Sequence, residues 1–185
     1  HALLVIALDA DRPSVLVACD KSKLPEMYQT DNDYATILRF AIRSALIDAV
    51  KIEGSLDEDD IDDIAGQAVD LGSVPIIVIR ADQGAKADEL VQKMESRWDL
   101  EAKTFELAVP VQTKEDIQAL EDAAKAFHEA HHDATVIPHP IGKIAKEAML
   151  QGQTFGAPLL YTTDGEETET LPTSTAIHKL LHPEE

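Results

Sequence analysis

The segment from Pro138 to Lys143 combines residue types that can hold and transform an anionic group. The imidazole of His139 can transfer a proton near neutral pH. Gly142 permits a close approach of backbone amides to a ligand, and Lys143 can neutralise a negative charge. We predict a site for a small anionic or phosphorylated ligand, in which His139 is catalytic and Gly142 and Lys143 bind the ligand. A proline-rich turn with a solvated lysine is the alternative interpretation.

Two carboxylates one residue apart follow the first apolar run of the chain, in the sequence Leu8-Asp9-Ala10-Asp11. This short sequence resembles the first motif of the haloacid-dehalogenase phosphotransferase superfamily. The resemblance implies that Asp9 is a nucleophile, that Asp11 is an acid/base, and that a magnesium ion compensates their charge. An aspartate-rich turn between two strands accounts for the same residues.

The sequence His128-Glu129-Ala130-His131-His132 satisfies the HExxH pattern of zinc hydrolases. Two histidines four residues apart can hold zinc on one side of a helix, and the glutamate can activate water. This pattern makes His128 and His132 candidate metal ligands. A solvated helix end, where histidines oppose the negative end of the helix dipole, is the alternative.

Strand-like and helix-like segments alternate along most of the chain. The first two predicted strands, at 2–8 and 14–19, are joined by turn-type residues and form a predicted antiparallel hairpin. A single helix is predicted from Asp33 to Ile52, and a second helix ends near Gly72. The further predicted strands are 74–80, 104–111, 134–138 and 158–162. The further predicted helices are 85–98, 114–131, 141–150 and 174–181.

This alternation favours βαβ crossovers and therefore a mostly parallel sheet. We predict a single α/β domain over residues 1–185, a three-layer α/β sandwich with a mixed, mostly parallel sheet and an N-terminal β-hairpin. Ligands of such sheets bind beyond the carboxyl ends of the strands. That rule adds Asp82, Gly84, Thr163 and Asp164 to the predicted cofactor-binding residues.

Composition restricts the class of protein. The chain carries 35 acidic and 16 basic side chains, and its formal net charge is −19. Such a surface repels phosphate backbones and anionic lipids, so we expect no nucleic-acid or membrane partner. The single cysteine excludes an internal disulfide and favours a cytoplasmic location.

The sequence leaves three functions open. The first is a domain that binds a small anionic or phosphorylated ligand at the carboxyl edge of its sheet, with metal-assisted hydrolase or transferase activity as one extension. The second is a non-catalytic acidic interaction or regulatory module, which could form a homo-oligomer. The third is a zinc-dependent hydrolase that uses the HEAHH sequence. The cofactor is unknown, and magnesium and zinc are the candidates.

Overall fold

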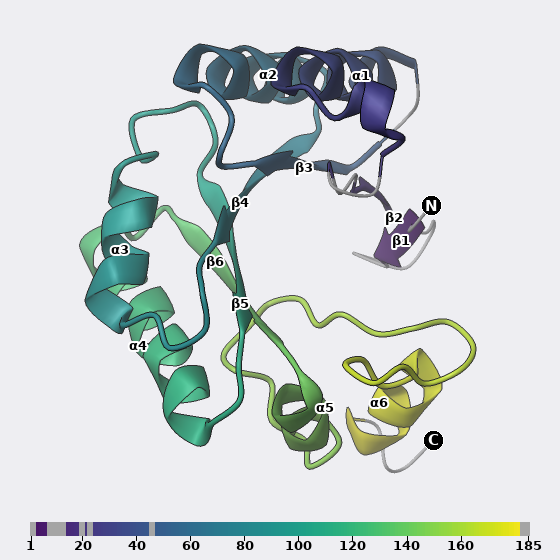
Figure 1. The fold of residues 1–185 in the computed structure, drawn as a ribbon, viewed down its shortest axis with the longest axis vertical. Coiled ribbons are helices and arrows are strands. Elements are labelled where there is room, and N and C mark those ends of the chain that lie inside the picture. The colour runs from purple at the N-terminus through teal and green to yellow at the C-terminus, as the bar shows by residue number, and fades with distance from the viewer. Residues whose placement is uncertain (1–2, 7–13, 19–20, 22–23, 45–46, 182–185) are drawn as a thin grey trace. The chain divides into compact units, whose positions relative to one another are not determined.

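A computed structural model describes the chain except for residues 1–2, 7–13, 19–20, 22–23, 45–46 and 182–185 (Figure 1). Its elements, in chain order, are β1 (Leu3–Ile6), β2 (Ser14–Val17), the 3-10 helix η2 (Glu26–Tyr28), α1 (Asp31–Ser44), β3 (Ala49–Glu53), α2 (Glu58–Asp70), β4 (Val74–Arg80), α3 (Ala87–Glu95), β5 (Thr104–Pro110), α4 (Lys114–Ala130), β6 (Thr135–Ile141), α5 (Lys143–Met149) and α6 (Ser174–Leu181).

The chain divides into two compact units. The first contains residues His1–Val78 and Glu95–Phe105, and the second contains Ile79–Met94 and Glu106–Glu185. The division passes through β4 and β5, so each unit holds part of both strands. These two units do not test whether the chain forms a single domain, so the single α/β domain stays a prediction.

In the first unit, β1 pairs antiparallel with β2, and β2, β3 and β4 pair parallel to one another. Helices α1 and α2 pack against each other and against β3. The guanidinium of Arg39 joins the two helices, because it lies 2.7 Å from Asp60 and 2.7 Å from Asp63. The hydrogen bond from Arg39 is the main reason that the pKa of Asp63 lies below its ordinary value.

In the second unit, β5 lies next to β6, and helices α4 and α5 pack against β6. The backbone N–H of Val111, just after β5, donates to Ile141 at the end of β6 over 2.9 Å. Lys86, just before α3, contributes to the lowered pKa of Asp116 in the first turn of α4. The starts of α3 and α4 therefore lie near each other, as expected for helices that follow neighbouring parallel strands.

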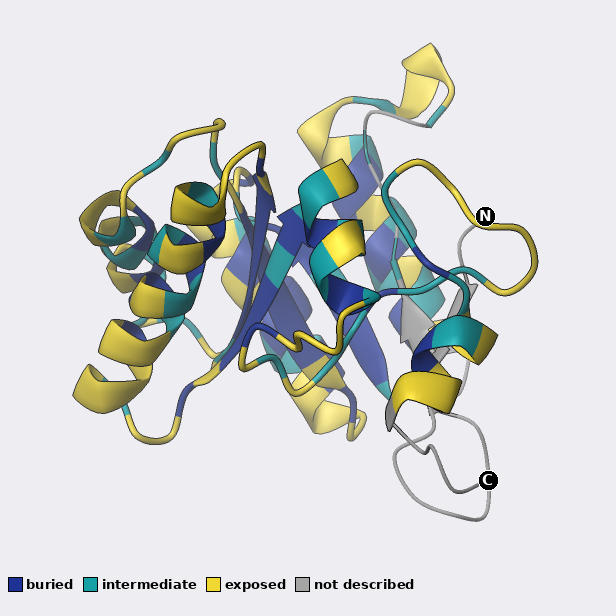
Figure 2. Ribbon diagram, turned by 90° about the horizontal axis from the view of Figure 1, so that it is seen from below, coloured by how far each residue is buried: buried dark blue, intermediate teal, exposed yellow. Residues whose placement is uncertain are grey.

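Most residues of strands β3 to β6 are buried, whereas the helices bury one side and show exposed residues along the other (Figure 2). In β4 and β5 the five central residues are all buried. Such continuous burial is typical of parallel strands that are covered on both faces. Among the described residues, no helix has the length and apolar character needed to span a membrane.

The predicted helix from Asp33 to Ile52 is wrong in its second half. The helix α1 ends at Ser44, and Ala49–Glu53 form strand β3. Alanine and isoleucine at positions 49 and 52 fit a helical spacing, but Val50 and Ile52 also alternate with Lys51 and Glu53 as a strand requires. The pairing of β3 with β2 and β4 decides between the two patterns.

The strands β4 and β5 and the helices α4, α5 and α6 are confirmed within one or two residues. Helix α3 ends three residues before its predicted end, and β6 ends three residues after it. The segment 158–162 is not a strand in the structure, and the next residue, Thr163, makes an isolated bridge to Thr173. The turn that would make β1 and β2 a hairpin lies in 7–13, outside the described residues.

Candidate functional site

Strand β5 carries a carboxylate in the middle of an apolar sequence. Glu106 is only 2% exposed, and its neighbours Phe105 and Leu107 are fully buried. Moving a carboxylate out of water is costly unless hydrogen-bond donors surround it. The second unit supplies such donors from two further segments.

The two oxygens of Glu106 have different partners. Nδ1 of His139, from β6, lies 2.8 Å from Oε1. The hydroxyl of Tyr161 donates to Oε2. The rings of His139 and Tyr161 also stack, with centroids 4.1 Å apart and planes inclined by 32°. We call Glu106, His139 and Tyr161 the polar centre.

The proton positions in the polar centre follow from this geometry. Burial, and then the negative charge of Glu106, raise the pKa of Tyr161 far above its ordinary value. The phenol therefore stays neutral and acts as a donor. With Glu106 ionised, the proton of the imidazole belongs on Nδ1, which leaves Nε2 of His139 able to accept a proton.

The imidazole of His139 is accessible at one side. Its side chain is 19% exposed, whereas that of Glu106 is 2% exposed. A cavity of about 10 Å³, room for about one water molecule, lies against His139 and Tyr161. The arrangement is a carboxylate that orients a partly exposed imidazole, which is suited to general acid–base chemistry.

The residues predicted to bind an anion beside His139 lie at the start of α5. Gly142 begins this helix with φ of 152°. The side chain of Lys143 is 76% exposed, and its Nζ lies 3.9 Å from Glu147 on the next turn. Lys143 thus faces solvent and a neighbouring carboxylate, as in the alternative interpretation of this segment.

The remaining predicted binding residues form turns. The carbonyl of Asp82 accepts from Ala85 over 3.3 Å, and Gly84 has φ of 79° in the turn before α3. The hydroxyl of Thr163 donates to the carbonyl of Glu166 over 2.9 Å, and Asp164 is exposed. Asp9 and Asp11, the predicted catalytic carboxylates, lie outside the described residues.

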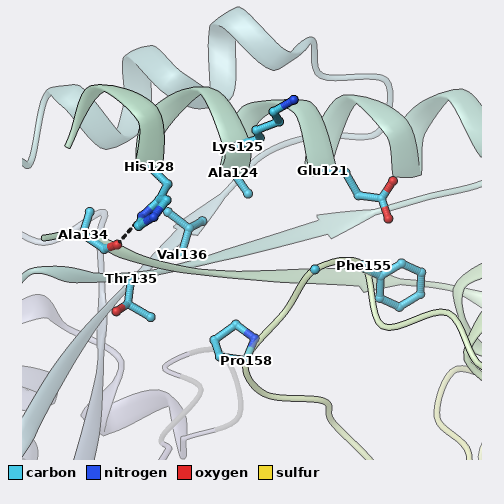
Figure 3. A pocket seen from close by; sticks show the side chains of 10 residues that line it. Glu121, Ala124, Lys125, His128, Ala134, Thr135, Val136, Phe155 and Pro158 are labelled. Atoms are coloured by element: carbon cyan, nitrogen blue, oxygen red, sulfur yellow. Dashed lines mark hydrogen bonds between the residues drawn. The ribbon is translucent and has the colours of Figure 1, made fainter. Parts of the chain in front are cut away.

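Of the two predicted metal ligands, His128 lies in the last turn of α4, whereas His132 lies beyond the end of this helix at Ala130. Nδ1 of His128 is 3.0 Å from the carbonyl of Ala134, and His128 lines a surface pocket of about 420 Å³ with Lys125 and Glu121 (Figure 3). His132 is exposed, and its ring centroid lies 6.1 Å from that of His128. Within the described residues, no three metal-ligating side chains come together.

The sequence analysis missed Glu106 and Tyr161. A signal for the first was present, because a glutamate inside the strand-like sequence Thr104 to Val111 must find partners if the strand is buried. For Tyr161, the predicted strand 158–162 contained the residue but gave no indication of a partner 55 positions away.

Solved structures define the class of this fold. The chain is similar to type I 3-dehydroquinate dehydratase from Clostridium difficile, with a TM-score of 0.71, 20% identity, and coverage of 83% of this chain and 63% of that one. The enzyme from Geobacillus kaustophilus gives a TM-score of 0.71 at 16% identity and covers 92% and 68%. The α/β fold with parallel strands is thus similar to that of the TIM-barrel dehydroquinases. The three-layer sandwich is not confirmed.

Comparison of the amino-acid sequence with known protein families gives the same family as the solved structures. The model of the type I 3-dehydroquinase family matches residues 4–184, so the chain belongs to this family. The curated 3-dehydroquinate dehydratase of Salmonella paratyphi B is 26% identical over 149 residues, which are 80% of this chain and 59% of the relative. The chain therefore spans about three fifths of the length of the curated relatives that it matches.

Family membership corrects the functions expected from the sequence. Type I dehydroquinases are lyases that form a Schiff base and use no metal. This finding overturns the phosphorylated-ligand domain with metal-assisted hydrolase or transferase activity, and also the non-catalytic interaction module. It excludes the zinc hydrolase built on the HEAHH sequence. The assignment of His128 and His132 as metal ligands stays a prediction.

Proposed function

We propose that the protein to which this chain belongs removes water from 3-dehydroquinate, the reaction for which its curated relatives are named. The match of the family model over residues 4–184 carries this proposal. The polar centre supports it, because a dehydratase needs a group that takes a proton from carbon and returns it to a leaving hydroxyl.

A direct assay tests this function. Loss of water from a β-hydroxy ketone creates a conjugated carbonyl, so product formation can be followed by ultraviolet absorbance. The full-length protein is mixed with 3-dehydroquinate, and we expect enzyme-dependent growth of this absorbance. Absence of product across a range of pH and salt concentrations would show that the proposal is wrong.

A pair of histidine variants links the activity to the polar centre. His139→Asn is expected to lower kcat by about 10²- to 10⁴-fold, the usual contribution of general acid–base catalysis. His132→Asn removes an exposed imidazole and should leave kcat unchanged. Equal kcat values for His139→Asn and His132→Asn would show that His139 takes no part in the reaction.

Several expectations from the sequence stay proposals beside this function. A cytoplasmic location is consistent with a family of soluble enzymes. Self-association, a small anionic ligand and the lack of nucleic-acid or membrane partners remain predictions from charge and composition. The three-layer arrangement of helices about the sheet also remains a prediction.

A further inference from the structure

A pocket of about 420 Å³ lies on the second unit and does not include the polar centre. It is lined by Glu121 and Ala124 from α4, Val136 from β6, and Phe155 and Pro158 from the segment after α5 (Figure 3). We call it the α4 pocket. Its volume lies in the range of small-molecule sites, and its apolar wall favours a ligand with an apolar body. The proposed dehydration uses none of these residues.

The charge that the α4 pocket presents is negative. In Figure 3 the carboxylate of Glu121 extends from α4 toward Phe155, whereas the ammonium of Lys125 extends away from the strand. Nζ of Lys125 instead lies 3.9 Å from Glu129. The whole chain also has a formal net charge of −19, which raises the local concentration of cations. Both features favour a positively charged ligand.

Glu121 can accept hydrogen bonds from such a ligand. Its Oε1 atom accepts from Nε2 of Gln153 over 3.1 Å. Among the described residues the structure gives no partner to Oε2, and an ionised carboxylate accepts at both oxygens. A primary ammonium ion carries three donors and matches this acceptor. The ligand class is therefore a primary amine with an apolar body.

The other polar side chain of α4 in the pocket has a different role. Nδ1 of His128 lies 3.0 Å from the carbonyl of Ala134, and a carbonyl oxygen only accepts, so Nδ1 is the donor. Figure 3 shows His128 and Glu121 at opposite ends of the α4 pocket, two helical turns apart. His128 therefore faces the end of the ligand that lies away from the ammonium group.

Phe155 has a backbone conformation that bulky residues rarely adopt. Its φ is 57° and that of Gly156 is 66°, and the N–H of Ala157 donates to the carbonyl of Thr154 over 2.9 Å. Positive φ at both central residues is typical of a type I′ turn, where glycine, asparagine or aspartate is usual. Phe155 is nevertheless only 3% exposed, so packing of its ring outweighs the preference of the turn.

The side chain of Phe155 borders two spaces. Besides the α4 pocket, it lines the cavity of about 10 Å³ that lies against His139 and Tyr161. Because this cavity has room for about one water molecule, a small displacement of the Phe155 ring changes the surroundings of Tyr161. Strained residues of this kind are frequent at ligand clamps and switches.

We propose that the α4 pocket binds a primary amine with an apolar body, that Glu121 holds its ammonium group, and that Phe155 couples the pocket to the polar centre. The inference does not depend on the dehydratase function. Because coupling between sites is reciprocal, the amine and a ligand of the polar centre should change each other's affinity by the same factor.

Three compounds of similar shape test the charge preference. 2-Phenylethylamine is the probe, and 2-phenylethanol and phenylacetate are its neutral and anionic counterparts. Isothermal titration calorimetry should show about tenfold or higher affinity for the amine than for the alcohol, the effect of one hydrogen bond to a charged group. Phenylacetate should bind most weakly. Equal affinities for the three compounds would overturn the ligand class.

A pair of glutamate variants locates the amine. Glu121→Gln keeps the shape and removes the charge, so the affinity for 2-phenylethylamine should fall about tenfold, to that of the alcohol. Glu115→Gln removes an exposed carboxylate at the start of α4, outside the pocket, and should leave the affinity unchanged. Equal losses in both variants, or a loss in neither, would overturn the site.

NMR of the aromatic rings tests the coupling. Saturation with 2-phenylethylamine should shift the ring signals of Tyr161 and His139 and leave the indole N–H of Trp98, in the first unit, unchanged. In Phe155→Leu, which keeps an apolar side chain, the amine should bind without these shifts, and the Trp98 signal reports that the variant is folded. Unshifted Tyr161 and His139 in the wild type, or equal shifts in Phe155→Leu, would overturn the coupling through Phe155 and leave the amine site standing.

Discussion

Gly142 and Val111 are in direct backbone contact, because a Cβ atom added to Gly142 would lie 2.5 Å from the carbonyl oxygen of Val111. The contact joins the start of α5 to the residue that follows β5. Gly142 also has φ of 152°, in the range that side-chain-bearing residues rarely adopt. Two independent features therefore require glycine three residues after His139.

Gly142→Ala should destabilise the protein by about 1–3 kcal/mol, because alanine here combines an unfavourable backbone conformation with a clash against a carbonyl group. Urea unfolding of both proteins measures the difference. Gly66→Ala is the matched control: Gly66 lies inside α2 with open space around its Cα, and alanine there should stabilise by about 0.5–1 kcal/mol. Equal free energies of unfolding for the two variants would contradict the prediction.

Asp116 closes the first turn of α4. It accepts from the backbone N–H groups of Gln112 over 2.9 Å and Thr113 over 3.0 Å, while the Thr113 hydroxyl accepts from Asp116 N–H over 3.1 Å. The hydrogen bond from Gln112 is the largest reason that the pKa of Asp116 lies below its ordinary value of 3.8. Asp116→Ala should therefore cost about 1 kcal/mol near neutral pH.

The sign of the pH dependence follows from this lowered pKa. The ionised carboxylate stabilises the folded state above pH 3.8, and that contribution is lost as the pH falls through the folded pKa. The difference between wild type and Asp116→Ala, measured by unfolding at several pH values, should shrink in acid. Asp122→Ala, at an exposed position within the same helix, should show no such loss at neutral pH. A difference that grows in acid would contradict this account.

The extent to which the sequence predicted the site depends on distance along the chain. His139 was predicted because proline, glycine and lysine surround it locally. Its partner Glu106 lies 33 positions away on the neighbouring strand, and only strand pairing brings the two together. The helix α4 was predictable because its capping box and apolar spacing are local. Strand β3 was not, because Ala49 and Ile52 fit a helical spacing while Val50 and Ile52 fit a strand, and only the pairing with β2 and β4 decides between them.

Removing His128 or His132 should distinguish a structural histidine from a metal ligand. His128→Ala loses the contact of Nδ1 with Ala134 and should cost about 0.5–1.5 kcal/mol. His132→Ala removes an exposed ring and should change the free energy of unfolding by less than about 0.5 kcal/mol. Treatment with EDTA should not alter the melting temperature. Equal losses in both variants, together with destabilisation by EDTA, would indicate a metal bound by the pair.

Salt should stabilise this protein. The formal net charge of −19 produces repulsion that is relieved on unfolding, and added ions screen it. Ion pairs such as Lys125 with Glu129 are weakened by the same screening, but an exposed pair contributes only about 0–1 kcal/mol. The melting temperature should rise with NaCl and level off as the Debye length falls from about 10 Å at 0.1 M to about 3 Å at 1 M. A rise that continues linearly beyond this range would indicate exclusion of salt from the protein surface as the cause, and a fall would show that attractive pairs outweigh the repulsion.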